Sequence, residues 1–168
     1  MMCARRLIDE AAITRPDFLE PADRGSERHA QALTSASHDQ SKERRVNQRT
    51  QRVLLVEDDA DVRELLRIVL AQTGYTVNAV EDGQCAKAAL QTACHDLLIT
   101  DYHLPDIQGN LLISYARSVY PCLATLLISA EPGVAHIAAL CHAHAWFVKG
   151  QPLAGFLAAV TAALDRAG

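Results

Sequence analysis

Residues 53–59 of this chain read VLLVEDD, a short aliphatic run that ends abruptly in three carboxylates. Three more runs have the same form: residues 97–101 read LLITD, residues 124–129 read ATLLIS and residues 146–149 read WFVK. In an open parallel sheet, ligands bind beyond the carboxyl ends of the strands. If the four runs are parallel strands, their carboxylates, hydroxyl and ammonium group should therefore converge on one site.

The segments between these runs are typical of helices. Apolar residues recur there at helical spacing, for example at Val62, Leu66 and Val69. The predicted elements alternate as strand 53–56, helix 60–72, strand 75–80, helix 84–93, strand 97–100, helix 109–119, strand 123–128, helix 134–143, strand 145–148 and helix 153–166. Right-handed crossovers place helices on both faces of such a sheet. The predicted fold class is therefore α/β, with a doubly wound parallel sheet of five strands.

The composition narrows the class of protein. Of the 168 residues, 49% are apolar, which is enough for a core, and the formal net charge of −4 argues against direct binding to nucleic acid. The chain has no apolar stretch long enough to span a bilayer and no signal peptide pattern. Its five cysteines lack the CxxC spacing of a zinc site, which favours reduced thiols. We expect a cytoplasmic protein that binds neither nucleic acid nor membrane directly.

The chain divides into two parts of different character. Residues 1–51 are polar, and from Ser35 to Arg52 there is almost no apolar residue apart from Val46. Such a segment cannot bury enough surface to offset its conformational entropy, so we expect a disordered extension. A wrongly assigned start codon would leave a similar segment. Residues 52–168 are expected to form the folded domain.

The strand-terminal residues indicate phosphoryl chemistry. Three carboxylates in one crevice repel each other, and Mg²⁺ is the hard, oxygen-seeking cation that suits such a set. An aspartate there can act as a nucleophile toward phosphorus, and Lys149 adds a second positive charge. The competing interpretation is that these residues are solvated turn residues or helix caps. For any one position both interpretations stay open, but the presence of such residues at all four strand endings argues against turns or caps.

Together these motifs identify a family. The segment from Val53 to Leu164 resembles the receiver domain of two-component response regulators. The motifs that carry the resemblance are residues 53–59, residues 96–109 (DLLITDYHLPDIQG), residues 127–130 (LISA) and residues 146–149. The resemblance implies a flavodoxin-like (βα)5 receiver fold with strand order 2-1-3-4-5.

The resemblance also implies a phosphoacceptor and a metal site. Asp101 matches the phosphoacceptor aspartate of the family. Glu57 and Asp58 match its acidic pair, with Asp58 as the more direct ligand of Mg²⁺. Asp101 itself and the backbone carbonyl of His103 complete the implied ligand set.

The remaining implied roles concern switching. Ser129 matches the hydroxyl that turns toward the phosphoryl group, Trp146 matches the aromatic switch position, and Lys149 matches the lysine that pairs with the phosphate. The family usually has proline directly after this lysine, on a cis peptide bond, whereas here Gly150 and Gln151 intervene. A cis bond at a non-proline residue costs about 3 kcal/mol, so we expect this loop to be built in another way.

The sequence thus predicts a stand-alone phosphorelay signalling protein. We expect Mg²⁺-dependent phosphorylation of Asp101 by a histidine kinase or phosphotransfer protein, which switches a surface for an unknown downstream protein. In this interpretation the chain is not an enzyme beyond catalysing its own phosphorylation and dephosphorylation. One alternative is a receiver-like scaffold that acts without phosphorylation. Another is a hydrolase with an aspartyl nucleophile, in which His103 would be the general acid.

Overall fold

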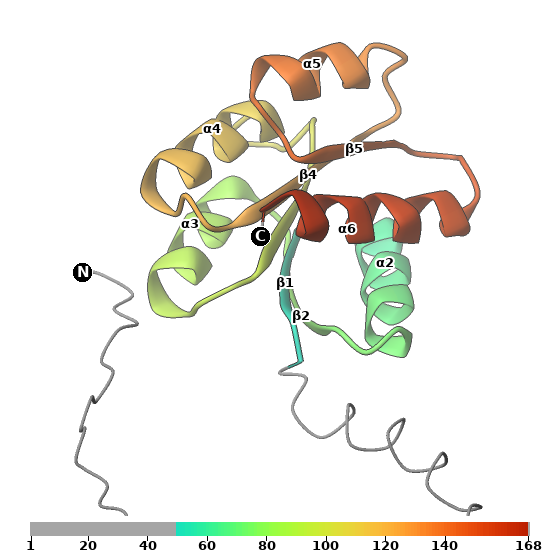
Figure 1. The fold of residues 1–168 in the computed structure, drawn as a ribbon, viewed down its shortest axis with the longest axis horizontal. Helices are drawn as coiled ribbons and strands as arrows, with labels where there is room; N and C mark the ends of the chain where they lie inside the picture. Colours follow the sequence, from blue (N-terminus) through green and yellow to red (C-terminus); the bar gives the residue numbers. More distant parts are fainter. Residues whose placement is uncertain (1–49, 168) are drawn as a thin grey trace, which may run out of the picture. The chain divides into compact units, whose positions relative to one another are not determined.

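The computed structural model describes residues 50–167, so the expectation for the polar extension of residues 1–51 lies almost wholly outside the described part and stays a prediction. The elements are β1 (Arg52–Val56), α2 (Ala60–Gln72), β2 (Thr76–Val80), α3 (Gly83–Thr92), β3 (Leu97–Asp101), α4 (Gly109–Val119), β4 (Ala124–Ser129), α5 (Val134–Leu140), β5 (Ala145–Val148) and α6 (Leu153–Ala167). All strand pairs are parallel, and their order is β2-β1-β3-β4-β5. The predicted fold class and strand order are confirmed (Figure 1).

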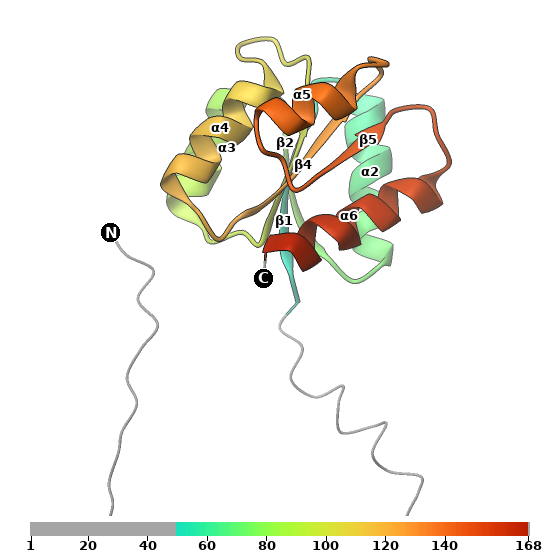
Figure 2. The ribbon, with the colours of Figure 1, turned by 45° about the horizontal axis from the view of Figure 1, so that its top comes forward.

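Helices cover both faces of the sheet. Helices α2 and α6 lie on one side and α3, α4 and α5 on the other, as both ribbon views show (Figures 1 and 2). The central strands β3 and β4 are buried at every position, which explains why their sequences are almost continuously apolar. The edge strand β2 is partly exposed. No helix within residues 50–167 has the length and hydropathy needed to cross a bilayer.

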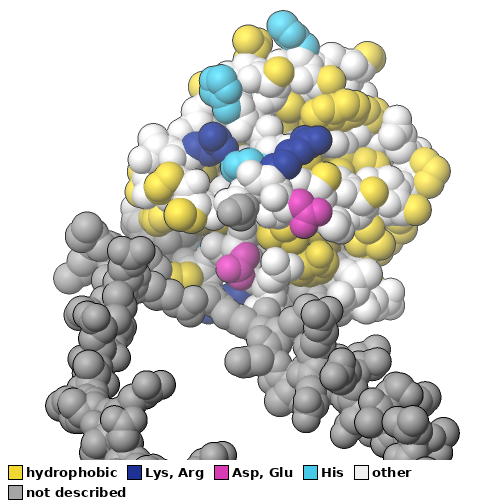
Figure 3. All heavy atoms as spheres, viewed as in Figure 1, with side chains coloured by type: hydrophobic (Ala, Val, Ile, Leu, Met, Phe, Trp, Pro, Cys, Tyr) yellow, Lys and Arg dark blue, Asp and Glu magenta, His cyan; other side chains and the backbone are white. Residues whose placement is uncertain are grey.

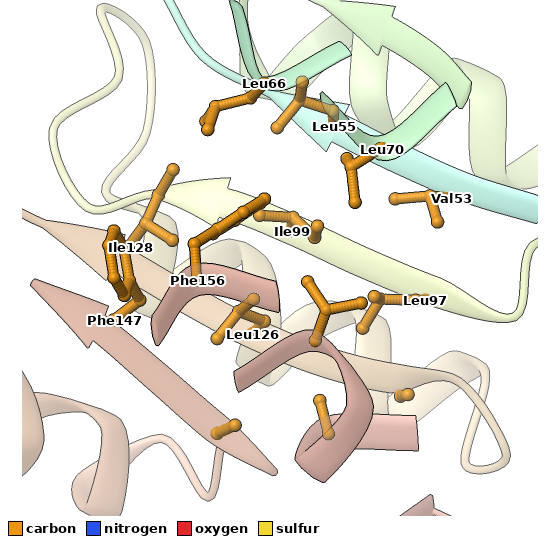
Figure 4. Close-up of a cluster of buried hydrophobic side chains, with 14 residues drawn as sticks. Val53, Leu55, Leu66, Leu70, Leu97, Ile99, Leu126, Ile128, Phe147 and Phe156 are labelled. Carbon is orange, nitrogen blue, oxygen red and sulfur yellow. The ribbon is translucent and has the colours of Figure 1, made fainter. Parts of the chain in front are cut away.

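The core on the α2 and α6 side is mainly aliphatic (Figure 4). Leu66 and Leu70 of α2 pack there against strand residues such as Leu55. Its aromatic members Phe147 and Phe156 meet edge to face with ring centroids 5.5 Å apart. This packing fixes β5 against α6, and therefore fixes the end of β5 at Val148, which Lys149 follows.

Polar side chains set where helices α2 and α3 begin. Asp59 caps α2 by accepting hydrogen bonds from the amides of Asp61 and Val62. Asp82 caps α3 by accepting from the amide of Cys85 at 2.7 Å. Each cap lies a few residues after the end of a strand, so the carboxylates that follow β1 and β2 serve partly to start the next helix.

Helix α5 is shorter than the predicted helix 134–143, since it ends at Leu140. The chain is turned out of the helix by His142, which adopts a left-handed conformation with φ +55°. The amide of Ala143 then bonds back to the carbonyl of Ala138 at 2.8 Å, which satisfies a terminal carbonyl of the helix. Glycine usually occupies such a position, so a histidine there gave no signal in the sequence.

Candidate functional site

The strand register places the four polar strand endings at one edge of the sheet. Val56 of β1 lies opposite Thr100 of β3, so Glu57 and Asp101 follow side by side. Asp101 in turn lies opposite Ile128, which precedes Ser129. Ser129 lies opposite Val148, which precedes Lys149. The convergence expected from the sequence is therefore present.

Three carboxylates form the centre of this edge. One ligand oxygen from each of Glu57, Asp58 and Asp101 lies within 4.8 Å of the others. Glu57 is fully buried and Asp101 is 5% exposed, whereas Asp58 faces solvent. This donor set consists of hard anionic oxygens with one open side, which suits a hydrated divalent cation such as Mg²⁺.

The ammonium group of Lys149 bridges two of these carboxylates. It donates a hydrogen bond to Oε1 of Glu57 at 2.9 Å, and it lies 2.7 Å from Oε2 of Glu57 and 2.9 Å from Oδ2 of Asp101. Burial raises the pKa of Glu57 above its usual range, and Lys149 only partly offsets this effect. Burial would lower the pKa of Lys149, but its contacts with the two carboxylates outweigh burial and raise that pKa. Lys149 is therefore a firmly protonated internal counter-ion.

The backbone around Asp101 fixes the orientation of its carboxylate. The amide of Tyr102 donates to Oδ1 of Asp101 at 2.8 Å, which leaves Oδ2 to Lys149. Gly109, the first residue of α4, packs directly on the Asp101 carbonyl, because a Cβ at this position would lie 2.0 Å from that oxygen. The amide of Gly109 also donates to the carbonyl of Tyr102 at 2.8 Å. The start of α4 and the end of β3 are thus held in close contact.

Arg63 supports the acidic pair and was not anticipated from the sequence. Its Nη1 donates to the carbonyls of Glu57 and Asp58 at 2.5 and 3.0 Å. Its Nη2 lies 3.9 Å from Oε2 of Glu81, in the loop after β2. The available signal was position alone: Arg63 stands one turn into α2, where its side chain can reach back to the loop that precedes the helix.

His103 lies beside the site with its imidazole turned to solvent. Its Nε2 lies 3.3 Å from Oε1 of Glu131, and both side chains are more than half exposed. The backbone of His103 pairs with Gln108 as an isolated bridge, so the loop between β3 and α4 closes on itself. The implied role of its carbonyl as a metal ligand stays a prediction.

The two implied switch residues differ in burial. Ser129 is buried, and its Oγ accepts a hydrogen bond from the amide of Glu131 at 3.0 Å. Trp146, in contrast, is 45% exposed on the edge strand β5. Hydrophobic side chains are numerous on the side of the molecule formed by β5 and α6 in Figure 3, and Leu153 at the start of α6 is 40% exposed.

The loop after Lys149 is built by a glycine turn. Gly150 has φ +88°, a conformation that favours glycine, and the amide of Gln151 bonds back to the carbonyl of Val148 at 3.4 Å. Every peptide bond between residues 50 and 167 is trans, as expected for the bond after Lys149. The amide of Lys149 donates to the carbonyl of Ser129 at 2.8 Å, so the lysine remains in register with β4.

Comparison with known proteins agrees with this geometry. Residues 53–150 match the family described as response regulator receiver domain. The chain is 37% identical over 83 residues to the response regulator protein FleR of Pseudomonas aeruginosa, and the aligned region covers 49% of this chain and 18% of FleR. It is 36% identical over 84 residues to the response regulator receiver protein CpdR of Brucella abortus, and this aligned region covers 50% of the chain and 70% of CpdR. The chemotaxis response regulator CheY4 of Vibrio cholerae superposes with a TM-score of 0.64 at 26% identity, over 69% of this chain and 100% of CheY4. The match thus spans a small part of FleR and most of CpdR.

Proposed function

This chain belongs to the response regulator receiver domain family, and we propose that it accepts a phosphoryl group on Asp101. The proposed donor is a histidine kinase or a phosphotransfer protein of a two-component system. The observation that carries the proposal is the ammonium group of Lys149 at 2.9 Å from Oδ2 of Asp101. It puts a positive charge where the oxygens of a transferred phosphoryl group would lie.

In the proposed reaction an oxygen of Asp101 attacks phosphorus and forms a new P–O bond. The bond from phosphorus to the donor nitrogen breaks, and its electron pair stays on that nitrogen. The amide of Tyr102 and the ammonium group of Lys149 hold the two carboxylate oxygens before attack. Phosphoryl transfer depends mainly on positioning and on charge stabilisation, and these two contacts supply part of both.

The residues at this edge also fit a divalent cation. Three ionised carboxylates and one ammonium group would leave the crevice with a net charge of about −2. We propose Glu57, Asp58 and Asp101 as side-chain ligands of Mg²⁺, with the backbone carbonyl of His103 as a further ligand. When bound, Mg²⁺ would neutralise charge on the carboxylates and on the phosphoryl oxygens.

Phosphorylation is proposed to act through Ser129 and Trp146. The Ser129 hydroxyl would exchange its bond from the Glu131 amide for one to a phosphoryl oxygen. When the Ser129 side chain turns toward the phosphoryl group, it would leave room beside β5, and the exposed Trp146 could move into that room. The surface of α5, β5 and α6 would then change, which is a shift between two packings driven by the new contacts.

Incubation of the full chain with acetyl phosphate and Mg²⁺ tests the proposal. We expect a hydroxylamine-labile adduct, detected on a phosphate-affinity gel, that is lost in Asp101→Asn. The matched control is Asp96→Asn, because Asp96 directly precedes the opposite end of the same strand, where its carboxylate accepts a hydrogen bond from the amide of Arg52. An adduct that persists in Asp101→Asn would contradict the assignment.

A scaffold that works without phosphorylation is the second candidate. The observation that favours it is the turn at Gly150, which takes the place of the proline that usually follows the lysine in this family. This interpretation requires that acetyl phosphate gives no adduct at all while the chain still binds its partner. The presence of an Asp101-dependent adduct would therefore decide against it.

A further inference from the structure

The loop that follows Asp101 is tied to helix α3 by a carboxylate with no role in the proposed chemistry. Oδ1 of Asp106 accepts a hydrogen bond from the amide of Gly83 at 2.9 Å, and Oδ2 accepts from the amide of Gln84 at the same distance. The two partners are 22 and 23 residues away in the sequence. A carboxylate at a helix N-terminus also interacts favourably with the helix dipole.

An apolar contact reinforces this link. A Cβ at Gly83 would lie 2.1 Å from Cγ2 of Ile107, so Ile107 packs on the bare backbone of the glycine. Gly83 is buried, although it is the first residue of a surface helix. The dipeptide Asp106-Ile107 is therefore docked on the start of α3 by both polar and apolar contacts.

Capping alone does not explain the presence of Asp106. Helix α3 already has a local cap in Asp82, whose Oδ1 accepts from the amide of Cys85 at 2.7 Å. Asp106 satisfies two further amides, but it comes from a different loop and so joins two separate parts of the chain. The additional effect of the contact is to fix the loop between β3 and α4.

This loop connects Asp106 to Asp101 through a short, internally bonded stretch of backbone. The loop is closed by the bridge between His103 and Gln108 and by the bond from the Gly109 amide to the Tyr102 carbonyl. On the other side, the amide of Glu57 donates to the carbonyl of Val80 at 3.1 Å, at the start of the loop that leads to α3. The stretch from Val80, the last residue of β2, to Gln84 in the first turn of α3 therefore contacts both Glu57 and the loop that follows Asp101.

We propose that Asp106 is a positioning residue for the metal site, an inference that rests on the proposed function. By docking on Gly83 and Gln84, its carboxylate sets how far the backbone after Asp101 lies from the acidic pair. Loss of this contact should lower the affinity for Mg²⁺, because the ligands would no longer be held at a fixed separation. Removal of groups that orient metal ligands typically weakens metal binding about 10–100-fold.

The test is calorimetric titration of the full, metal-free chain with Mg²⁺. Asp106→Ala should raise the Kd for Mg²⁺ about tenfold, and Asp106→Asn, which keeps one acceptor oxygen, should raise it less. The matched control is Asp82→Ala, which removes a cap from the same helix but leaves the acceptor loop docked. Its Kd should stay within about twofold of the wild type. Gly83→Ala should act like Asp106→Ala, because its Cβ would push Ile107 and the loop away.

A merely structural role predicts a different result. A change in global stability does not alter the Kd of a site as long as the protein stays folded, which urea unfolding of each variant would establish. Equal Kd values for Asp106→Ala and Asp82→Ala would overturn the inference. An Asp58→Ala variant separates this outcome from failure of the proposed function: if wild type and Asp58→Ala bind Mg²⁺ alike, the metal site itself is wrongly assigned.

Discussion

Replacement of Gly109 by alanine tests how closely the acceptor strand and α4 must approach. The added Cβ would lie 2.0 Å from the carbonyl oxygen of Asp101 and 3.1 Å from Oγ1 of Thr100. Close contacts between carbon and a carbonyl oxygen fall at about 3.3 Å or more, so the first of these distances must increase by about 1.3 Å. The obstructing atom belongs to the backbone of a central strand and cannot rotate away. Helix α4 or the acceptor itself must move.

The energetic cost has three contributions. Retreat of α4 breaks the bond from the Gly109 amide to the Tyr102 carbonyl, which contributes about 1 kcal/mol. It also disturbs the packing of Leu112 and Ile113, both fully buried, at the cost of about 1–3 kcal/mol that overpacking usually carries. The higher helix propensity of alanine offsets at most about 1 kcal/mol. We therefore expect a net loss of about 2 kcal/mol in the free energy of unfolding.

Urea unfolding of the metal-free chain measures this loss against two glycine controls. Gly133→Ala places its Cβ in open space, so its stability should change by less than about 0.5 kcal/mol. Gly155→Ala lies inside α6, where its Cβ meets only a ring carbon of Phe147 at 3.6 Å, and it should stabilise by about 0.5–1 kcal/mol. If Gly109→Ala unfolds at the same urea concentration as Gly133→Ala, the close approach drawn from the structure is wrong.

Three further predictions concern the surroundings of the site. Arg63→Ala should raise the Kd for Mg²⁺ about tenfold in calorimetry, because the carbonyls of the acidic pair lose their donor. Arg67→Ala on the same helix, whose guanidinium pairs with the exposed Glu64, should leave this Kd unchanged. Gly150→Ala should lower the free energy of unfolding by about 1–2 kcal/mol through its positive φ alone, and a variant as stable as the wild type would argue against the left-handed turn. Burial lowers the pKa of His144, so the unfolded chain binds its proton more readily, and stability should fall as the pH drops below about 6.5. His144→Asn keeps an acceptor for the amide of Thr125. Its free energy of unfolding, measured with urea, should fall less than that of the wild type between pH of about 7.5 and 5.5, and an equal fall would exclude His144 as the cause.

The central site was predictable because parallel strands bring their carboxyl ends to one edge. Each polar residue after an apolar run could be assigned to that edge without knowledge of distances, and Glu57, Asp58, Asp101 and Lys149 do meet there. Periodicity likewise predicted every strand and helix of the described part. What it could not predict was the early end of α5, since the left-handed residue there is a histidine and not a glycine.

The supports of the site were not predictable for a different reason. Arg63 and Asp106 are charged residues in ordinary surface positions, and nothing in their neighbours marks them. Asp106 acts on amides more than 20 residues away, and such pairings depend on where loops end in space. The orientations of Ser129 and Trp146 depend on local packing and hydrogen bonding, which residue identity alone could not fix.

The charge balance of the site explains why it can exist before any cation or phosphoryl group arrives. Glu57 is fully buried, and an unpaired carboxylate there would be costly. Lys149 relieves this cost by contacting Glu57 and Asp101 together, yet Asp58 remains exposed and outside that bridge. One ammonium group therefore stabilises the fold without neutralising the crevice. The residual negative charge would attract a divalent cation, and the bridged Asp101 would already be held for the proposed attack on phosphorus. The same incomplete balance would then serve both folding and the proposed chemistry.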